Sequence, residues 1–342
     1  MPHSMNSEMV LRYQRHDAGP RLCHYKPRSI EKKITFAAEA ARSLERIPRS
    51  LNPKFFYNKT GSMLFDQICQ LPEYYLTRTE IKILQHMQDE IPQYLPVDYR
   101  LVELGSGSAV KTRLILDVLD RLQERVEFFP IDVSDILDES SLNLLESYPN
   151  LYITGVIDTF ESGLEFIKRH GGGPNLIAFL GSSLGNFESH NAQAFLEQIA
   201  GTMREEDLFL LGLDLVKDRC VLEQAYNDSQ GVTARFNLNV LQRINDELDG
   251  DFVLDDFAHH CIFNQDHSRI EMHLRSKREQ TVNIPRAGLK IHLRENELIH
   301  TEHSHKYTIP RIKNMMQSAG LDTLKIWQDS EFQYCVVLAS RI

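Results

Sequence analysis

The hydrophobic positions of residues 99–216 follow two patterns that alternate along the chain: short apolar runs, and longer stretches with apolar residues three or four apart. Short runs are typical of buried strands, and the longer stretches are typical of amphipathic helices. We therefore predict an α/β fold with a doubly wound parallel sheet. The predicted strands are Leu101–Leu104, Phe128–Asp132, Leu151–Val156, Leu176–Leu180 and Leu208–Leu213. The predicted helices include Ala109–Arg125, Ile136–Ser147, Phe160–Arg169 and Asn191–Thr202.

The pattern changes after Lys217. A helix pattern over Val232–Leu248 precedes segments with strand-like alternation, which we interpret as an insertion with its own antiparallel strands. A helix over Pro310–Ala319 and two final strands then complete a seven-stranded sheet whose last strand is antiparallel. The strands of the insertion are predicted at Cys261–Asn264, Ile270–Leu274, Lys290–Leu293 and Leu298–Glu302, and the final strands at Leu324–Trp327 and Tyr334–Leu338.

The N-terminal part of the chain shows helix patterns but no strand. Residues 1–27 have no period, and we predict a flexible arm there. Helices are expected over residues 28–49, from Gly61 onward, and from a cap at Thr77 to about Ile91. We predict a substrate-binding α+β domain from residues 28–78 and 217–302, and a cofactor-binding domain from residues 79–216 and 303–342.

Composition and charge limit the possible partners. The chain has 342 residues, 42% of them hydrophobic and 25% charged, and a formal net charge of −10. The negative charge and the lack of a Lys/Arg run argue against nucleic acid as the main partner. No stretch is apolar enough to span a membrane, and the start lacks a signal-peptide core. We expect a cytoplasmic monomer that acts on a small molecule.

The cysteines and histidines do not form a metal-ligand pattern. Five scattered cysteines without C-x-x-C spacing favour free, reduced thiols. The strand-like alternation of residues 299–306 would place His303 and His305 on one face and Glu302 and Ser304 on the other. We predict no metal site.

The most informative motif follows the first predicted strand: Glu103-Leu-Gly-Ser-Gly107. It is typical of a strand, a tight glycine turn and a helix N-terminus that binds a nucleotide-like ligand. Val110 stands where a dinucleotide fold or a P-loop would have a further glycine. Asp132 ends the second strand, where an acid can accept hydrogen bonds from ribose hydroxyls. The motif resembles the first motif of class I S-adenosylmethionine-dependent methyltransferases.

Longer motifs resemble those of the histidine-specific methyltransferase family, typified by the L-histidine Nα-methyltransferase of ergothioneine biosynthesis. The resemblance spans about residues 28–340 and implies two domains and three methyl transfers from S-adenosylmethionine to the α-amino group of histidine, giving hercynine. The motifs lie at residues 57–66, 71–80, 103–113, 179–187, 212–218, 225–234, 269–275 and 301–307.

The resemblance implies cofactor-binding positions around the glycine turn and the strand ends. The backbone at Gly105 would hold the amino-acid end of the cofactor, with Ser106 in the same turn, and Lys111 would face its carboxylate. Asp132 would bind the ribose. The family has an acid directly before the phenylalanine that flanks the adenine, whereas this chain has Thr159 there and the acid one residue earlier. The positions expected at the adenine are Asp158, Thr159 and Phe160.

The resemblance also implies the substrate residues. Tyr74 and Asn186 are the predicted catalytic residues, which would position the amine, and Tyr226 would help to bind the carboxylate and amine. Glu302 and Ser304 match the pair that binds the imidazole, since a carboxylate accepts from a ring N–H and a hydroxyl serves the other nitrogen. The further predicted pocket residues are Tyr57, Phe65, Gly181 and Met272.

Two other functions remain open from the residues alone. A family member could methylate another free amino acid, such as tryptophan, but this would leave Glu302 buried and poorly matched. A non-catalytic scaffold that binds S-adenosylmethionine is the second alternative, and loss of the glycine turn or of Asp132 would favour it. Both features are present. Histidine is therefore the predicted substrate, with catalysis mainly by proximity.

Overall fold

The computed structural model of the protein describes residues 12–28, 36–107, 109–133, 137–329, 331 and 334–342. The chain divides into two compact units, each assembled from separate stretches of sequence. Unit 1 consists of Met1–Ile30, Leu76–Leu215 and Tyr307–Ile342, and unit 2 of Glu31–Tyr75 and Val216–Lys306.

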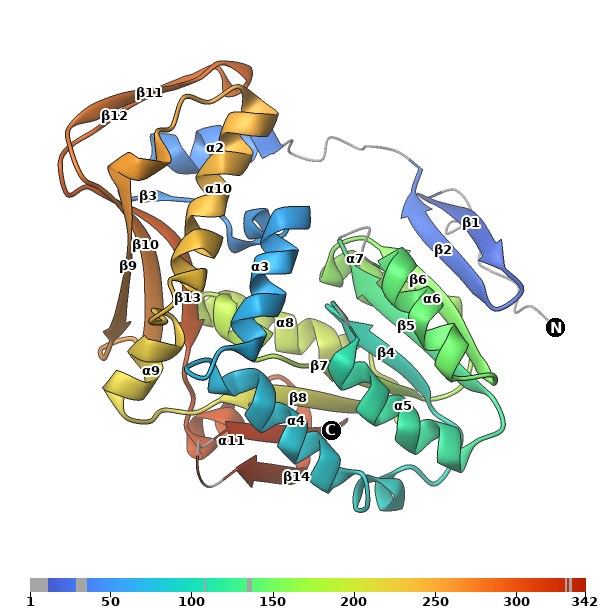
Figure 1. Ribbon diagram of the computed structural model, residues 1–342. Helices are drawn as coiled ribbons and strands as arrows, with labels where there is room; N and C mark the ends of the chain where they lie inside the picture. The colour runs from blue at the N-terminus through green and yellow to red at the C-terminus, as the bar shows by residue number, and fades with distance from the viewer. Residues whose placement is uncertain (1–11, 29–35, 108, 134–136, 330, 332–333) are drawn as a thin grey trace. The chain divides into compact units, whose positions relative to one another are not determined.

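Unit 1 is built on a nine-stranded sheet with the order β1-β2-β6-β5-β4-β7-β8-β15-β14 (Figure 1). The strands from β2 to β8 in this order pair in parallel, whereas β15 is antiparallel to both of its neighbours. The antiparallel strand agrees with the prediction. The strands are β1 Tyr13–Gly19, β2 Leu22–Pro27, β4 Arg100–Leu104, β5 Val126–Asp132, β6 Leu151–Ile157, β7 Asn175–Phe179, β8 Leu208–Asp214, β14 Leu321–Asp329 and β15 Tyr334–Arg341.

Helices cover both faces of this sheet, as in a doubly wound fold. In Figure 1, α4, α5 and α6 lie on one face, and α7, α8 and α11 on the other. The apolar side chains of this second group pack with the sheet into one buried cluster that includes Phe166, Ile199 and Met316. The helices are α4 Tyr75–Met87, η2 Ile91–Tyr94, α5 Val110–Leu122, α6 Leu137–Ser147, α7 Phe160–His170, η3 Ser183–Asn186, α8 Ser189–Thr202 and α11 Ile309–Ser318.

The prediction of a flexible arm over residues 1–27 is wrong for its second half. Tyr13–Pro27 forms a hairpin whose strand β2 pairs in parallel with β6, so the sheet has nine strands rather than seven. Only the first residue of β1 is buried and the rest of this edge strand is exposed. The strand therefore lacks the apolar alternation that would have revealed it.

Unit 2 contains a four-stranded sheet with the order β3-β13-β10-β9 and a separate hairpin, β11-β12. Helix α10 packs against β9 and β10 and against α3. The strands are β3 Arg49–Ser50, β9 Phe257–Asn264, β10 Arg269–Ser276, β11 Gln280–Ile284, β12 Leu289–Leu293 and β13 Leu298–His305. The helices are α2 Phe36–Glu45, η1 Pro53–Phe56, α3 Lys59–Gln70, α9 Arg219–Ala225, α10 Val232–Leu248, η4 Leu254–Asp256 and η5 Pro285–Ala287.

Several element ends differ from the predictions. Helix α4 begins at Tyr75, two residues before the predicted cap at Thr77, and α3 begins at Lys59 because the Asn58 side chain caps it. Residues 29–35 of the first predicted helix lie outside the described residues, and strand β11 was not predicted. Among the described residues, no helix is both long and apolar enough to cross a lipid bilayer.

Candidate functional site

The glycine turn after β4 leaves the backbone open on one side. Gly105 has a φ of 75° and Gly107 a φ of 49°, a region that favours glycine. The ring of Phe160 lies 3.4 Å from the position that a Cβ on Gly105 would occupy. The Gly105 N–H donates to the Ile131 carbonyl at 2.8 Å, which ties the turn to β5. A ligand can therefore approach the main chain of this turn closely.

Ser106 and the start of α5 provide polar groups at the same turn. The Ser106 hydroxyl is buried without a hydrogen-bond partner among the described residues. Ala109, in the left-handed region with a φ of 59°, precedes α5 and offers no side-chain cap. Buried hydroxyls are normally paired, so an orphan hydroxyl beside a helix N-terminus fits a polar ligand. Asp132 is the last residue of β5, at the same end of the parallel sheet.

Glu103, the acid before the turn, is buried and paired. Its carboxylate accepts a hydrogen bond from the Thr112 hydroxyl at 2.6 Å. Burial raises the pKa of Glu103 to about 7, and the Thr112 hydrogen bond opposes that rise. The pairing links the end of β4 to the first turns of α5, and so fixes the glycine turn between them.

Glu80 organises a network that the sequence did not reveal. Its buried carboxylate accepts from the Gly181 N–H and the Tyr334 hydroxyl, each at 2.9 Å. It also forms a salt bridge with Lys111 at 2.9 Å. The predicted cofactor lysine thus has a protein carboxylate as a partner, and the N–H of the predicted substrate residue Gly181 is already used. Glu80 ends the motif at residues 71–80, but the sequence analysis assigned it no role, because its partners Lys111, Gly181 and Tyr334 are distant in the sequence.

Asp158 is held by residues of unit 1 at the end of β6. One oxygen accepts from the Thr159 N–H at 2.8 Å, and the other from the hydroxyl of Tyr13 in the N-terminal hairpin at 2.9 Å. The Thr159 side chain caps α7, which begins with Phe160. Thr159 therefore has a helix-capping role, while Asp158 is oriented by the hairpin that the sequence analysis took for a loose arm.

Asn186 ends the short helix η3 that follows β7. Its side chain is half-buried and makes no hydrogen bond to any residue in the described part of the chain. Ser182, at the start of this turn, adopts a left-handed φ of 56°, and its hydroxyl accepts from the Asp214 N–H at 3.0 Å. The Ser182 hydroxyl thus ties the turn to the end of β8, and the Asn186 amide is left for a ligand.

In unit 2, β10 and β13 bring three predicted substrate residues together. Met272 pairs with Glu302 across the two strands, and Ser304 follows two residues later on the same face. Glu302 is only 8% exposed and makes no hydrogen bond to a described residue. Burial raises the pKa of Glu302 to about 7, and the charge of Lys306 opposes that rise. A buried carboxylate without a hydrogen bond is costly and fits an external donor.

Aromatic side chains gather in the same unit. The Tyr74 ring lies edge-on to the rings of Tyr226 and Phe65, with centroids 6.0 and 6.3 Å apart. The Tyr57 ring contacts Phe65 in the same way at 5.7 Å. Phe236 of α10 packs against both Tyr57 and Phe65, a contact that the sequence did not predict. Burial raises the pKa of Tyr74 well above its ordinary value.

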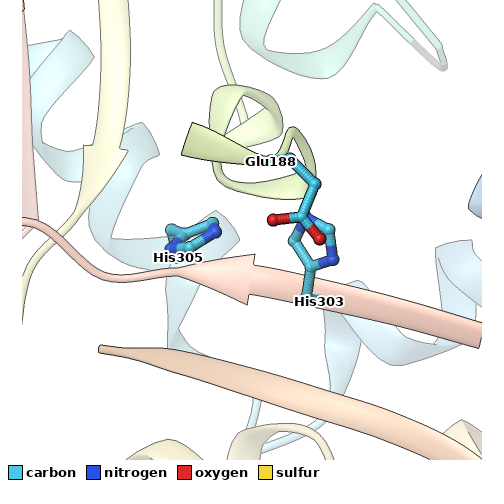
Figure 2. A group of neighbouring side chains, drawn as sticks. All are labelled: Glu188, His303 and His305. Atoms are coloured by element: carbon cyan, nitrogen blue, oxygen red, sulfur yellow. The ribbon is translucent and has the colours of Figure 1, made fainter. Parts of the chain in front are cut away.

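The opposite face of this sheet carries a row of histidines. Neighbouring rings in the order His260, His273, His300, His303 and His305 have centroids 5.2 to 6.2 Å apart. Figure 2 shows the last two rings on the same side of β13. Burial lowers the pKa of His300 to about 4, so this ring is neutral near pH 7. The predicted alternation between the histidines and the Glu302–Ser304 pair agrees with this arrangement.

The predicted site residues fall into two groups. The cofactor residues, together with Gly181 and Asn186, belong to unit 1, and seven substrate residues belong to unit 2. Those seven are Tyr57, Phe65, Tyr74, Tyr226, Met272, Glu302 and Ser304. Unit 1 thus has the open glycine turn, and unit 2 has the unpaired carboxylate with its aromatic surroundings.

A sequence model of the family described as "Histidine-specific methyltransferase, SAM-dependent" matches residues 36–341. The chain belongs to this family. The resemblance drawn from the motifs is thereby confirmed, and with it a class I methyltransferase fold, a methyltransferase activity and S-adenosylmethionine as the cofactor.

Three relatives show how widely the family has diverged. The chain is 40% identical to a histidine N-alpha-methyltransferase of Mycobacterium tuberculosis, over 87% of this chain and 92% of that protein. It is 29% identical to ergothioneine biosynthesis protein 1 of Neurospora crassa, over 82% of this chain and 32% of that protein. It is 25% identical to a 4-dimethylallyltryptophan N-methyltransferase of Claviceps purpurea, over 88% of this chain and 93% of that protein.

Proposed function

We propose that this methyltransferase acts on free L-histidine and transfers three methyl groups in succession to its α-amino group, giving hercynine as the first step of ergothioneine biosynthesis. The observation that carries the proposal is the buried carboxylate of Glu302, which has no hydrogen bond to a described residue. The 40% identity with the mycobacterial histidine N-alpha-methyltransferase supports the same substrate.

The imidazole ring supplies the groups that this pocket lacks. Glu302 would accept a hydrogen bond from a ring N–H, and the Ser304 hydroxyl would serve the other ring nitrogen. Met272, buried beside Glu302, would line the ring. A substrate without the matching N–H would leave the carboxylate buried and unpaired, which costs about 1–3 kcal/mol or more. The pocket therefore favours histidine over an amino acid with an apolar ring.

The amino-acid end would be held by Tyr74, Tyr226 and Asn186. The raised pKa of Tyr74 keeps it a neutral phenol near pH 7, so it orients the amine through hydrogen bonds rather than by removing its proton. A free amino group has a pKa of about 8, so a neutral, nucleophilic fraction exists without a strong base. We therefore assign catalysis mainly to orientation and to the exclusion of water.

The cofactor would be held by residues of unit 1. Ser106 has the orphan hydroxyl, Gly105 gives access to the backbone, and Asp132 stands at the strand end that suits a ribose. Lys111 would face the carboxylate of the cofactor, and Asp158 would lie at its adenine. Each of these side chains already has a protein partner. When bound, S-adenosylmethionine supplies a sulfonium-activated methyl group.

We further propose that the protein works as a monomer in the cytoplasm. None of the five cysteines forms a disulfide with another. Free thiols are typical of reducing compartments. Gel filtration of the purified protein would test the monomer, and fractionation of the producing cell would test the compartment.

Isothermal titration in the presence of S-adenosylhomocysteine tests the substrate. L-Histidine and Nα,Nα-dimethylhistidine should bind, and tryptophan should not. Glu302→Gln should weaken histidine binding about ten- to a hundredfold, since it removes a charged hydrogen-bond acceptor. Glu271→Gln is the matched control, because Glu271 lies on the other face of the sheet and pairs with Arg269.

Each result of the titration has a distinct meaning. Unchanged histidine affinity in Glu302→Gln would refute the imidazole assignment. Binding of tryptophan in place of histidine would favour a family member with another amino-acid substrate. Mass spectrometry of the product after incubation with S-adenosylmethionine decides the number of methyl groups, and a reaction that ends at one would refute the formation of hercynine.

A further inference from the structure

Three buried polar side chains of unit 2 form a closed triangle of hydrogen bonds. The Lys306 ammonium donates to the Tyr226 hydroxyl at 3.1 Å and to the Ser304 hydroxyl at 3.0 Å. Tyr226 donates to Ser304 at 2.9 Å. Lys306 is completely buried, Ser304 is 2% exposed and Tyr226 is 6% exposed. The sequence analysis assigned Lys306 no role.

The directions of these hydrogen bonds follow from the chemistry of the groups. An ammonium group has donors only, so Lys306 can only donate to its two partners. The Ser304 oxygen therefore accepts from both Lys306 and Tyr226, which occupies its two lone pairs. The proton of Ser304 cannot point along either bond and must point elsewhere.

We propose that Lys306 is a positioning residue that holds the Ser304 hydroxyl as a donor toward the ring of the substrate. The pocket would then present one acceptor, at Glu302, and one donor, at Ser304. This inference rests on the proposed function, because it assigns the ring nitrogens of histidine to these two groups.

The arrangement selects one form of the ring. A neutral imidazole has one N–H and one unprotonated nitrogen, which match the acceptor and the donor. An imidazolium ring has two N–H groups, and one of them would face the Ser304 proton. Lys306 thus sets which protonation state and which tautomer fit, although it need not touch the substrate.

A purely structural role for Lys306 must be distinguished from this one. The ammonium also lies 4.7 Å from the centre of the Tyr226 ring. Loss of this contact would weaken the binding of all ligands alike. The test therefore needs the ratio of the affinities for two ligands that differ only in which of the two ring positions holds the nitrogen acceptor.

Two thiazole analogues provide that ratio. In L-β-(thiazol-4-yl)alanine the ring nitrogen takes the place of histidine Nδ1, and in L-β-(thiazol-5-yl)alanine it takes the place of Nε2. Each ring offers an acceptor but no N–H. The isomer whose nitrogen faces Ser304 should bind the wild-type protein about five- to tenfold more tightly, as expected for one hydrogen bond.

The test is calorimetric titration of both isomers into the wild type, Lys306→Met, Ser304→Ala and the double variant, with S-adenosylhomocysteine present. In Lys306→Met the Ser304 hydroxyl is free to turn toward Tyr226, so the preference between isomers should fall to the value found in Ser304→Ala. Ser304→Ala should keep only the preference that Glu302 imposes, because the isomers also exchange nitrogen and sulfur opposite this carboxylate, and the double variant should match Ser304→Ala. Near-ultraviolet circular dichroism, which reports the packing of the aromatic side chains, shows whether each variant is folded.

Several outcomes would overturn the proposal. Equal binding of the isomers to the wild type would mean that Ser304 does not donate to the ring, and a full preference in Lys306→Met would mean that the lysine does not direct it. If Lys306→Met fails to fold, Lys306→Gln takes its place, because the glutamine amide oxygen can accept the Ser304 proton, and a full preference there would also be contrary. Failure of histidine itself to bind the wild type refutes the proposed function instead, so the two failures are distinguishable.

Discussion

Two glutamates show how the same residue type serves different purposes in this protein. Glu103 and Glu302 are both buried, and burial raises the pKa of each to about 7. Glu103 is paired with the Thr112 hydroxyl. Glu302 has no hydrogen bond to a described residue, and only the charge of Lys306 favours its ionised form. The first carboxylate therefore supports the fold, and we propose that the second binds a ligand.

The raised pKa of Glu302 predicts a pH dependence of stability. The folded protein keeps this proton up to a pH of about 7, while the ordinary value is 4.5, so the folded state binds more protons between the two values. Stability is therefore lost as the pH rises through this window. Glu302→Gln should gain up to about 3 kcal/mol relative to the wild type between pH 4.5 and pH 8. Urea denaturation without ligand measures this, and an equal difference at both pH values would contradict it.

At the scale of elements, the N-terminal hairpin pairs with the edge of β6 and also contacts Asp158, which follows that strand. Tyr13 and Tyr25 both pack their rings on Phe166, but only Tyr13 donates to Asp158. Tyr13→Phe should lower the affinity for S-adenosylhomocysteine about two- to tenfold, the effect of one hydrogen bond. Tyr25→Phe is the control and should leave the affinity unchanged. Equal effects of the two substitutions would mean that the hairpin acts through packing alone.

Strand β8 has a glycine, Gly212, at the point where helix α4 places the Glu80 carboxylate against it. A Cβ on Gly212 would lie 1.9 Å from Glu80 Oε1, so the carboxylate fits only against glycine. Gly212→Ala should displace Glu80 and destabilise the protein by about 2 kcal/mol or more. Gly201→Ala is the matched control, because Gly201 lies in α8 with open space around it, and it should be neutral or stabilising. Chemical denaturation compares the two variants.

The features that could be predicted from sequence are those with a local pattern. The central strands show as apolar runs because they are buried on both faces, and Glu302 and Ser304 share a face because of their spacing. Glu80 and Lys306 could not be assigned, since their roles depend on partners such as Tyr334 and Tyr226 that are distant in sequence. The edge strand β1 escaped prediction because it has almost no buried positions.

At the scale of the whole molecule, we propose that one unit binds the cofactor and the other binds the ring of the substrate. The glycine turn belongs to unit 1, and β10 and β13 belong to unit 2. S-adenosylhomocysteine should slow amide hydrogen exchange at residues 103–112, whereas histidine should slow it in β10 and β13. Mass spectrometry of exchanged peptides tests this. Protection of β10 and β13 by S-adenosylhomocysteine alone, with no protection of the glycine turn, would reverse the assignment.

The hairpin Tyr13–Pro27 also constrains the order in which the protein can assemble during synthesis. Its strand β2 pairs with β6, where Leu22 lies opposite Ile153. Because the hairpin precedes these elements in the chain, it must wait until β4, α5 and β5 have emerged and β6 has followed. Long-range pairing of this kind slows folding, and the waiting strands expose unpaired edges. The hairpin Tyr13–Pro27 should thus dock only after β6 has emerged, and until then its unpaired strand edge is open to a chaperone.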